Sequence, residues 1–302
     1  MPDDPFDAAF LRKLELLELA YRRLGGGHGT GESPGRDRGG RTDFRQHRRY
    51  SAGDDFRHID WNVYGRVEAL FVKEYAHEEQ RTVAVLLDCS RSMAFGRPSK
   101  LDYGKQLAAA FGYLALVAGD EAVVAPFSDR LCTATTISGQ KSRINEILRE
   151  LRPLAPAGPG PGGRTRLGEA IAQYHASSRH RSLVVLISDL LGEDGLADDC
   201  RRGLALLAAR GFEPCVVHLL SREEVDPARL GRLRLQDAET GRVRQLWFED
   251  AELQQYKAVL NEFIESWKSF CGRHGIPYVT AVSDVPFEEV MLGCLRDGGM
   301  VR

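Results

Sequence analysis

Five short apolar runs, which alternate with longer amphipathic segments, constrain the fold of this 302-residue chain more than any other feature. The runs have the length and the β-branched character of strands that are buried on both faces. They span residues 83–88, 122–127, 183–189, 215–220 and 278–282. Helical patterns fill the intervals near 100–119, 143–152, 167–179, 197–211 and 250–274. This alternation predicts an α/β domain over residues 82–302, built on a doubly wound, mostly parallel sheet that is flanked by helices.

Two segments interrupt the alternation. Residues 151–165 form a loop rich in proline and glycine, and a hairpin insertion is expected near residues 230–248, with its turn at Glu239, Thr240 and Gly241. Neither segment is apolar enough to contribute to a core. Both are therefore expected to be surface decorations.

The first 81 residues lie outside this pattern and divide into three parts. Apolar residues recur at helical spacing over 7–24, which predicts an N-terminal amphipathic helix within residues 1–24. Residues 25–40 contain eight glycines and one proline, a composition typical of a flexible linker. Residues 41–81 are expected to pack on the main domain. The sequence leaves open whether the helix packs on its own chain or on another copy.

Charge and composition favour a cytoplasmic protein without a membrane span. A net charge of −2 supplies no electrostatic reason for a nucleic-acid partner. The longest largely apolar run, 107–119, is shorter than the ~20 residues that a membrane helix needs, and the acidic first residues do not resemble a signal peptide. The six cysteines include no CxxC pair, so they are expected to be reduced and mostly buried.

Side chains that carry oxygen gather at the ends of two predicted strands. Asp88 closes one strand and is followed by Ser90 and Ser92, while Asp189 closes another and Thr165 opens a helix. If the strands are neighbours, the five side chains converge at the carboxyl edge of the sheet, where α/β proteins bind ligands. Carboxylates and hydroxyls form a hard oxygen set that suits Mg²⁺ or Mn²⁺. Such an ion keeps one position for water or for a carboxylate of another molecule.

This arrangement resembles the metal-ion-dependent adhesion site of von Willebrand factor A domains. The resemblance rests on the Asp-x-Ser-x-Ser loop at residues 88–92, on the later threonine and on the later aspartate, and it covers residues 82 to about 296. It implies that the five residues hold a divalent ion that captures an acidic residue of a protein partner. A structural alternative remains open, in which Ser90, Ser92 and Asp189 cap helices.

The segment before the predicted domain contains a distinctive set of residues: Tyr50, Gly53, Asp54, Arg57, Ile59, Asp60 and Trp61. This set resembles the signature of the bacterial family called domain of unknown function 58. The resemblance implies a partner of a MoxR-type AAA+ ATPase, which acts in the assembly or maturation of other proteins. The partner that offers the acidic residue is then the ATPase or its client.

The signature segment also has a physical interpretation of its own. Arg57, Asp60 and Arg66 are suited to ion pairs that lock the segment to the main domain, with Trp61 and Tyr64 as packing anchors. A docking surface for a partner is the alternative. We favour locking, because aromatic and paired charged residues more often fix a segment than bind a partner.

Catalytic functions are the main rivals to a binding function. No serine lies in a Gly-x-Ser-x-Gly motif, and His218 sits in an apolar run typical of the core, so a serine hydrolase is disfavoured. A metal-dependent phosphotransferase or nuclease that uses Asp88 and Asp189 is the better alternative. It needs further cationic or basic groups, and the nearby Lys100 and Lys105 are interpreted as solvent-facing residues of a helix.

The sequence therefore predicts a non-enzymatic module that binds proteins through a divalent metal ion. Cys89 lies between two predicted ligands, and a small apolar filler is its expected role, with a reactive thiol as the alternative.

Overall fold

The structure is a computed structural model, and it describes residues 4–24, 42–51, 54–56, 59–67, 69–77, 81–156, 167–178, 181–191, 196–227, 231–236 and 243–297. The chain divides into two compact units. The larger comprises residues 1–29 and 81–302, and the smaller comprises residues 30–80. None of the helices in the described ranges combines the length and the apolarity needed to cross a membrane.

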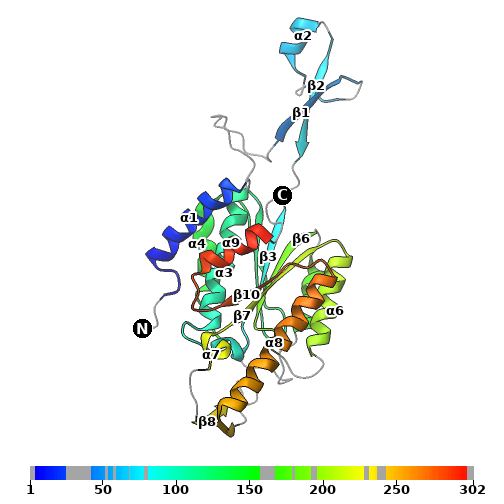
Figure 1. The fold of residues 1–302 in the computed structure, drawn as a ribbon. Helices are drawn as coiled ribbons and strands as arrows, with labels where there is room; N and C mark the ends of the chain where they lie inside the picture. The colour runs from blue at the N-terminus through cyan, green and yellow to red at the C-terminus, as the bar shows by residue number, and fades with distance from the viewer. Residues whose placement is uncertain are drawn as a thin grey trace. The chain divides into compact units, whose positions relative to one another are not determined.

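The larger unit is built on a central sheet, which contains six strands in the described part of the chain (Figure 1). They are β3 (Thr82–Asp88), β4 (Glu121–Phe127), β5 (Thr135–Ile137), β6 (Ser182–Ser188), β7 (Glu213–Leu220) and β10 (Tyr278–Val282). Their order is β10-β7-β6-β3-β4-β5, and all neighbours pair in parallel except β4 and β5. In chain order this is the 3-2-1-4-5-6 arrangement of doubly wound folds. The predicted fold class is confirmed, and the short edge strand β5 is an addition to the prediction.

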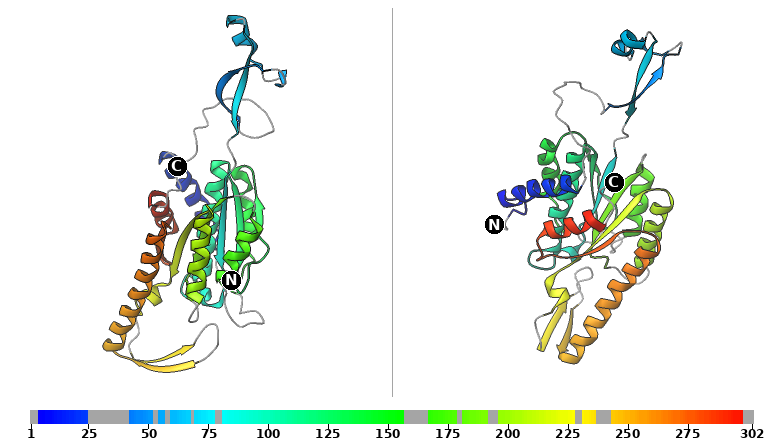
Figure 2. Two further views of the ribbon diagram at one scale, coloured as in Figure 1. Left: turned by 90° about the vertical axis from the view of Figure 1, so that its right-hand side faces the viewer. Right: turned by 45° about the horizontal axis from the view of Figure 1, so that its top comes forward.

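Helices cover both faces of this sheet (Figure 2). One face carries α3 (Lys100–Ala118), α4 (Ile144–Leu151) and α9 (Phe287–Asp297), and the other carries α5 (Leu167–Ser177), α6 (Leu196–Ala209) and α8 (Asp250–Arg273). Side chains of β3 alternate between the two cores: Val83 and Val85 face the first group of helices, and Ala84 and Leu86 face the second. A strand that is buried on both faces requires this pattern, and it explains why the run reads as continuously apolar.

Helix α3 packs tightly against β3 because residue 104 is a glycine. A Cβ atom on Gly104 would lie only 2.9 Å from Cδ1 of Leu87. The helix begins at the carboxyl edge of the sheet, where the Ser99 hydroxyl accepts a hydrogen bond from the amide of Asp102 at 3.1 Å. This cap fixes Lys100, the first helical residue, at the edge where β3 ends.

The N-terminal helix α1 (Ala8–Arg23) is an integral part of the larger unit. It packs on α3 and α9. Its buried side chains are Phe10, Leu14, Leu17, Glu18 and Tyr21. The Glu18 carboxylate accepts a hydrogen bond from Tyr113 Oη of α3 at 2.6 Å and pairs with Lys141 Nζ at 2.9 Å. The helix therefore packs on its own chain, which is the point that the sequence leaves open.

A hairpin separates β7 from α8. Strands β8 (Gly231–Gln236) and β9 (Val243–Phe248) pair in antiparallel register, and the predicted turn residues 239–241 lie outside the described residues. A single helical turn, α7 (Arg222–Val225), precedes the hairpin. Tyr256 Oη of α8 donates to the carbonyl of Glu224 at 2.8 Å, which ties α8 to α7.

The smaller unit contains an antiparallel pair of strands, β1 (Thr42–Arg49) and β2 (Phe71–His77), and the short helix α2 (Trp61–Val67). Asp60 begins the helix by accepting from the amide of Asn62 at 3.0 Å, and its other carboxylate oxygen lies 2.9 Å from Nε2 of His47. Arg57 lies outside the described residues. Within this unit Trp61 and Tyr64 are 63% and 43% exposed. Packing of the segment on the main domain stays a prediction.

Candidate metal centre

The candidate site lies where the connections of the sheet diverge. Strands β3 and β6 are neighbours, with Leu87 opposite Ile187, so their carboxyl ends are adjacent. The chain leaves β3 toward α3 on one face and leaves β6 toward α6 on the other. This is the switch point at which doubly wound folds bind ligands. Asp88 and Asp189 therefore follow neighbouring strands, which is the condition that the predicted site requires.

Asp88 is almost completely buried at this edge, with 1% of its surface exposed. One carboxylate oxygen accepts from the amide of Ser90 at 2.8 Å, and the other accepts from the Ser188 hydroxyl at 2.6 Å. The loop is held in turn by the amide of Cys89, which donates to the carbonyl of Phe127 on β4 at 2.8 Å. Ser188, a partner that sequence reasoning missed, is the residue of β6 directly before Asp189.

The two loop hydroxyls face each other. Ser90 Oγ and Ser92 Oγ lie 3.0 Å apart. Ser90 stands at the start of the single turn η2 (Arg91–Ala94), but its side chain makes no capping hydrogen bond. The capping alternative is therefore wrong for Ser90, whose hydroxyl points to Ser92 instead.

The spacing of the hydroxyls fits the geometry of a small divalent ion. Ligands at about 2.0–2.1 Å from an octahedral Mg²⁺ ion, at right angles to each other, lie about 3 Å apart. Within the described ranges no group of three or more His, Cys, Asp and Glu side chains is placed to hold a metal ion, so an ion here depends on hydroxyl ligands. The predicted ligand Thr165 lies outside the described residues, two positions before α5 begins.

Asp189 is fully buried and engaged on both carboxylate oxygens. One accepts from Lys100 Nζ at 2.8 Å, and the other accepts from the amide of Leu191 at 3.1 Å. Lys100 also donates to Oε1 of Glu224 on α7 at 2.6 Å. A buried cluster of one ammonium and two carboxylates therefore adjoins the Asp88 loop.

The interpretation of Lys100 and Lys105 as solvent-facing residues is wrong. Their exposed fractions are 0% and 5%. Lys105 pairs with Asp102 at 3.3 Å, and the buried Lys100 pairs with Asp189 and Glu224. The sequence contains one signal of these partners. A lysine in the first turn of a helix lies at the positive end of the helix dipole, which is unfavourable unless acidic side chains lie nearby.

The charges of the site do not balance within the protein. Burial and the neighbouring charge of Asp189 raise the pKa of Asp88 to about 7, against the hydrogen bonds from Ser188 and Ser90. Burial lowers the pKa of Lys100, but the charges and hydrogen bonds of Asp189 and Glu224 outweigh it, so the pKa is raised and the ammonium persists. Lys100 contacts Asp189 and Glu224, and Asp88 is a third carboxylate at the same sheet edge. Three ionised carboxylates and one ammonium carry a net charge of −2, which a divalent cation would neutralise.

Two further residues singled out in the sequence have core roles. Burial raises the pKa of Cys89 to about 12, so the residue is a buried thiol and not a nucleophile at neutral pH. His218 is fully buried, with Nδ1 2.6 Å from Tyr278 Oη, and burial lowers its pKa to about 4. A neutral imidazole hydrogen-bonded to a tyrosine is not positioned to activate a serine of the loop.

These thiol environments predict a simple labelling pattern. Cys132 is exposed, whereas the other five cysteines are buried. We expect Ellman's reagent to titrate one thiol rapidly in the native protein at pH 8, and Cys132→Ser to remove that phase. A second rapid phase that disappears in Cys89→Ala would instead show that the loop thiol is reactive.

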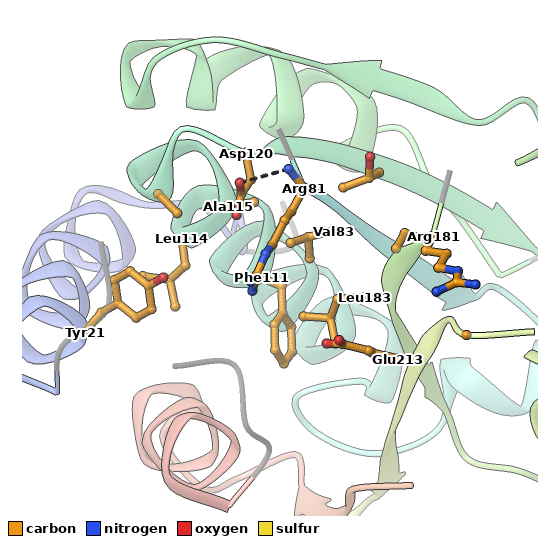
Figure 3. Close-up of a pocket in the computed structure, with 14 residues that line it drawn as sticks. Tyr21, Arg81, Val83, Phe111, Leu114, Ala115, Asp120, Arg181, Leu183 and Glu213 are labelled. Atoms are coloured by element: carbon orange, nitrogen blue, oxygen red, sulfur yellow. Dashed lines mark hydrogen bonds between the residues drawn. The ribbon is translucent and has the colours of Figure 1, made fainter. Parts of the chain in front are cut away.

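A cavity of about 280 Å³ lies at the opposite edge of the same sheet (Figure 3). Its lining includes Phe111 of α3, Tyr21 of α1 and Arg81, whose amide donates to Asp120 at 3.3 Å. Strand β3 separates this cavity from Asp88 by about 20 Å, given the ~3.3 Å rise per residue of a strand. The cavity therefore does not belong to the candidate metal centre.

Comparisons with known sequences agree with the signature residues. A model of the family described as "Protein of unknown function DUF58" matches residues 46–261. The chain is 30% identical over 260 residues to the uncharacterised protein Rv1480 of Mycobacterium tuberculosis, covering 82% of this chain and 76% of the relative. Among solved structures it is similar to the conserved hypothetical protein BatB from Bacteroides thetaiotaomicron, with 17% identity, a TM-score of 0.44 and coverage of 73% of this chain and 98% of that one. The SpRpn10 VWA domain matches with 9% identity, a TM-score of 0.40 and coverage of 70% and 94%.

Proposed function

Because the chain belongs to the DUF58 family and carries this loop at its sheet edge, we propose that it is a non-enzymatic module that binds a protein partner through a divalent metal ion. Asp88, Ser90 and Ser92 hold the ion, which is Mg²⁺ or Mn²⁺, and Thr165 and Asp189 complete the set. The observation that carries the proposal is the pair of hydroxyls 3.0 Å apart beside a buried carboxylate at the switch point. No catalytic side chain is required.

The donor set favours capture of an acidic group. Hydroxyl ligands are neutral, so the bound ion keeps enough positive charge to attract a further anionic oxygen. A partner that offers an aspartate or glutamate side chain supplies that oxygen. Asp88 holds the loop ready for this contact through the amide of Ser90.

The partner that the family signature implies is a MoxR-type AAA+ ATPase or a client of that ATPase. In this proposal the metal-bound edge docks an acidic side chain of the partner, and the pair acts in the assembly or maturation of other proteins. The signature residues support the proposal because they identify the family and not because of any contact within the chain.

The rival function, a metal-dependent phosphotransferase or nuclease, lacks support from the groups near Asp88 and Asp189. Such an enzyme needs a cation or a general base that is free to act on its substrate. Lys100 is buried between two carboxylates, and burial lowers the pKa of His218 to about 4. Both groups are committed to the fold, so binding is the function we prefer.

The test is a titration of Mg²⁺ and Mn²⁺ into the metal-stripped protein by isothermal calorimetry. We expect one site in the wild type and a loss of affinity of more than about tenfold in the Ser90→Ala/Ser92→Ala double variant, because two ligands are removed. Asp129→Asn serves as the control, since Asp129 follows β4 at the same sheet edge but its carboxylate accepts from Ser128. Equal affinity in the wild type and the double variant would contradict the proposed ligands.

A partner experiment follows from the same proposal. A pull-down with the immobilised full chain should recover the AAA+ ATPase in Mg²⁺ and release it in a chelator. Recovery that is indifferent to the chelator would contradict metal-dependent docking.

A further inference from the structure

Lys100 is the one lysine in the described part of the chain whose side chain is both fully buried and shared between two carboxylates. Its position is fixed from both ends. Its backbone follows the Ser99 cap of α3, and its ammonium lies between Asp189 and Glu224. Glu224 is itself held in place, because its second oxygen accepts from the amide of Ser221 at 2.7 Å. The ammonium group is therefore a built-in charge of the sheet edge.

The ammonium and a metal ion would compete for the same carboxylate. Asp189 is a proposed ligand of the ion, yet its Oδ2 atom is already 2.8 Å from Lys100 Nζ. Glu224 retains Lys100 even when Asp189 turns to the ion, since the second contact is 2.6 Å long. Positive charge thus stays in the site, and burial keeps water from screening it.

We infer that Lys100 sets the metal affinity of the site: its ammonium competes with the ion for Asp189, which keeps the free ion weakly bound and makes stable occupancy depend on the partner's carboxylate. The inference rests on the proposed function and adds to it a residue outside the five ligands. It explains why a protein-binding module would place a lysine beside a cation site. In the complex, an acidic side chain of the partner supplies negative charge to the ion, in place of the carboxylate charge that the Lys100 ammonium neutralises.

The test compares matched lysine variants. Lys100→Met keeps the straight apolar stem and removes the charge, so the affinity for Mg²⁺ alone should rise by about tenfold or more. Lys105→Met is the control, because Lys105 is a buried lysine of the same helix whose partner is Asp102. Its Mg²⁺ affinity should match that of the wild type. Calorimetric titration of each metal-stripped protein, with folding checked by circular dichroism, measures the difference.

A glutamate pair makes the test independent of the folding of Lys100→Met. Glu224→Gln removes a counter-charge of Lys100 and leaves the ammonium in place, so Mg²⁺ should bind more weakly by about threefold to tenfold. Glu223→Gln, at the exposed neighbouring position of α7, should leave the affinity unchanged. Opposite shifts in the two site variants are the signature of a charge effect.

The outcomes separate this inference from the proposed function. Binding by the wild type together with unchanged or weaker binding by a folded Lys100→Met, or with tighter binding by Glu224→Gln, overturns the inference and leaves the metal site intact. Mg²⁺ binding by Lys100→Met, without measurable binding by the wild type, supports the inference. Absence of binding in the wild type and in a folded Lys100→Met rejects the metal site, and the role of Lys100 with it.

Discussion

Asp88→Asn is expected to stabilise the metal-free protein at pH 8 by up to about 4 kcal/mol while it abolishes metal binding. Burial and the charge of Asp189 raise the pKa of Asp88 from 3.8 to about 7, so the ionised carboxylate is unfavourable in the fold. Asparagine has nearly the same shape and keeps an oxygen that accepts from the amide of Ser90. It removes the charge that the ion requires and that the metal-free fold tolerates poorly.

The raised pKa of Asp88 also predicts how the stability difference between Asp88→Asn and the wild type changes with pH. A carboxyl group whose pKa is raised on folding contributes its full stability below pH 4, and that stability is lost as the pH rises through about 7. The variant has no such group. The difference in free energy of unfolding between Asp88→Asn and the wild type should therefore open between about pH 4 and pH 7 and stay constant above. Urea unfolding in a chelator at several pH values measures it.

A structural role for Asp88 predicts the opposite result. If the carboxylate served only to anchor the loop through Ser90 and Ser188, Asp88→Asn would weaken charge-assisted hydrogen bonds and destabilise the protein at pH 8. Asp129→Asn again provides the control, since it changes the same functional group at the same edge. A destabilised Asp88→Asn variant would count against the metal site.

The parts of the site that sequence analysis predicts are those that depend on local rules. A buried parallel strand ends where its apolar run ends, so Asp88 and Asp189 are placed at the carboxyl edge by periodicity alone. Their proximity needs one further fact, that β3 and β6 are neighbours, and the chain order of doubly wound folds supplies it. Thr165 lies beyond the described residues, and its role as a ligand stays a prediction.

The parts that sequence analysis misses depend on long-range placement. Lys100 and Glu224 meet across 124 positions of the sequence, through the first residue of one helix and a single helical turn. The position of Lys100 in the first turn of α3 indicates that acids lie nearby, but nothing in the local pattern identifies Glu224 as one of them. Likewise β5 is only three residues long, and the sequences of β1 and β2 carry no strong alternation of apolar and polar residues, so the local pattern does not predict these strands.

The packing partner of the N-terminal helix could not be predicted from the sequence for the same reason. An amphipathic pattern shows that one face of a helix is buried, but it does not show which element covers that face. Phe10 is 2% exposed, and its ring lies 5.0 Å from that of Phe287 on α9. Phe10→Ala should therefore lower the free energy of unfolding by about 3–5 kcal/mol, as measured by urea unfolding. Leu16→Ala, on the same helix at a position that is 65% exposed, should change it by less than about 0.5 kcal/mol. Equal stability of the two variants would mean that α1 does not pack on its own α9 in solution, and that its apolar face is kept for another molecule.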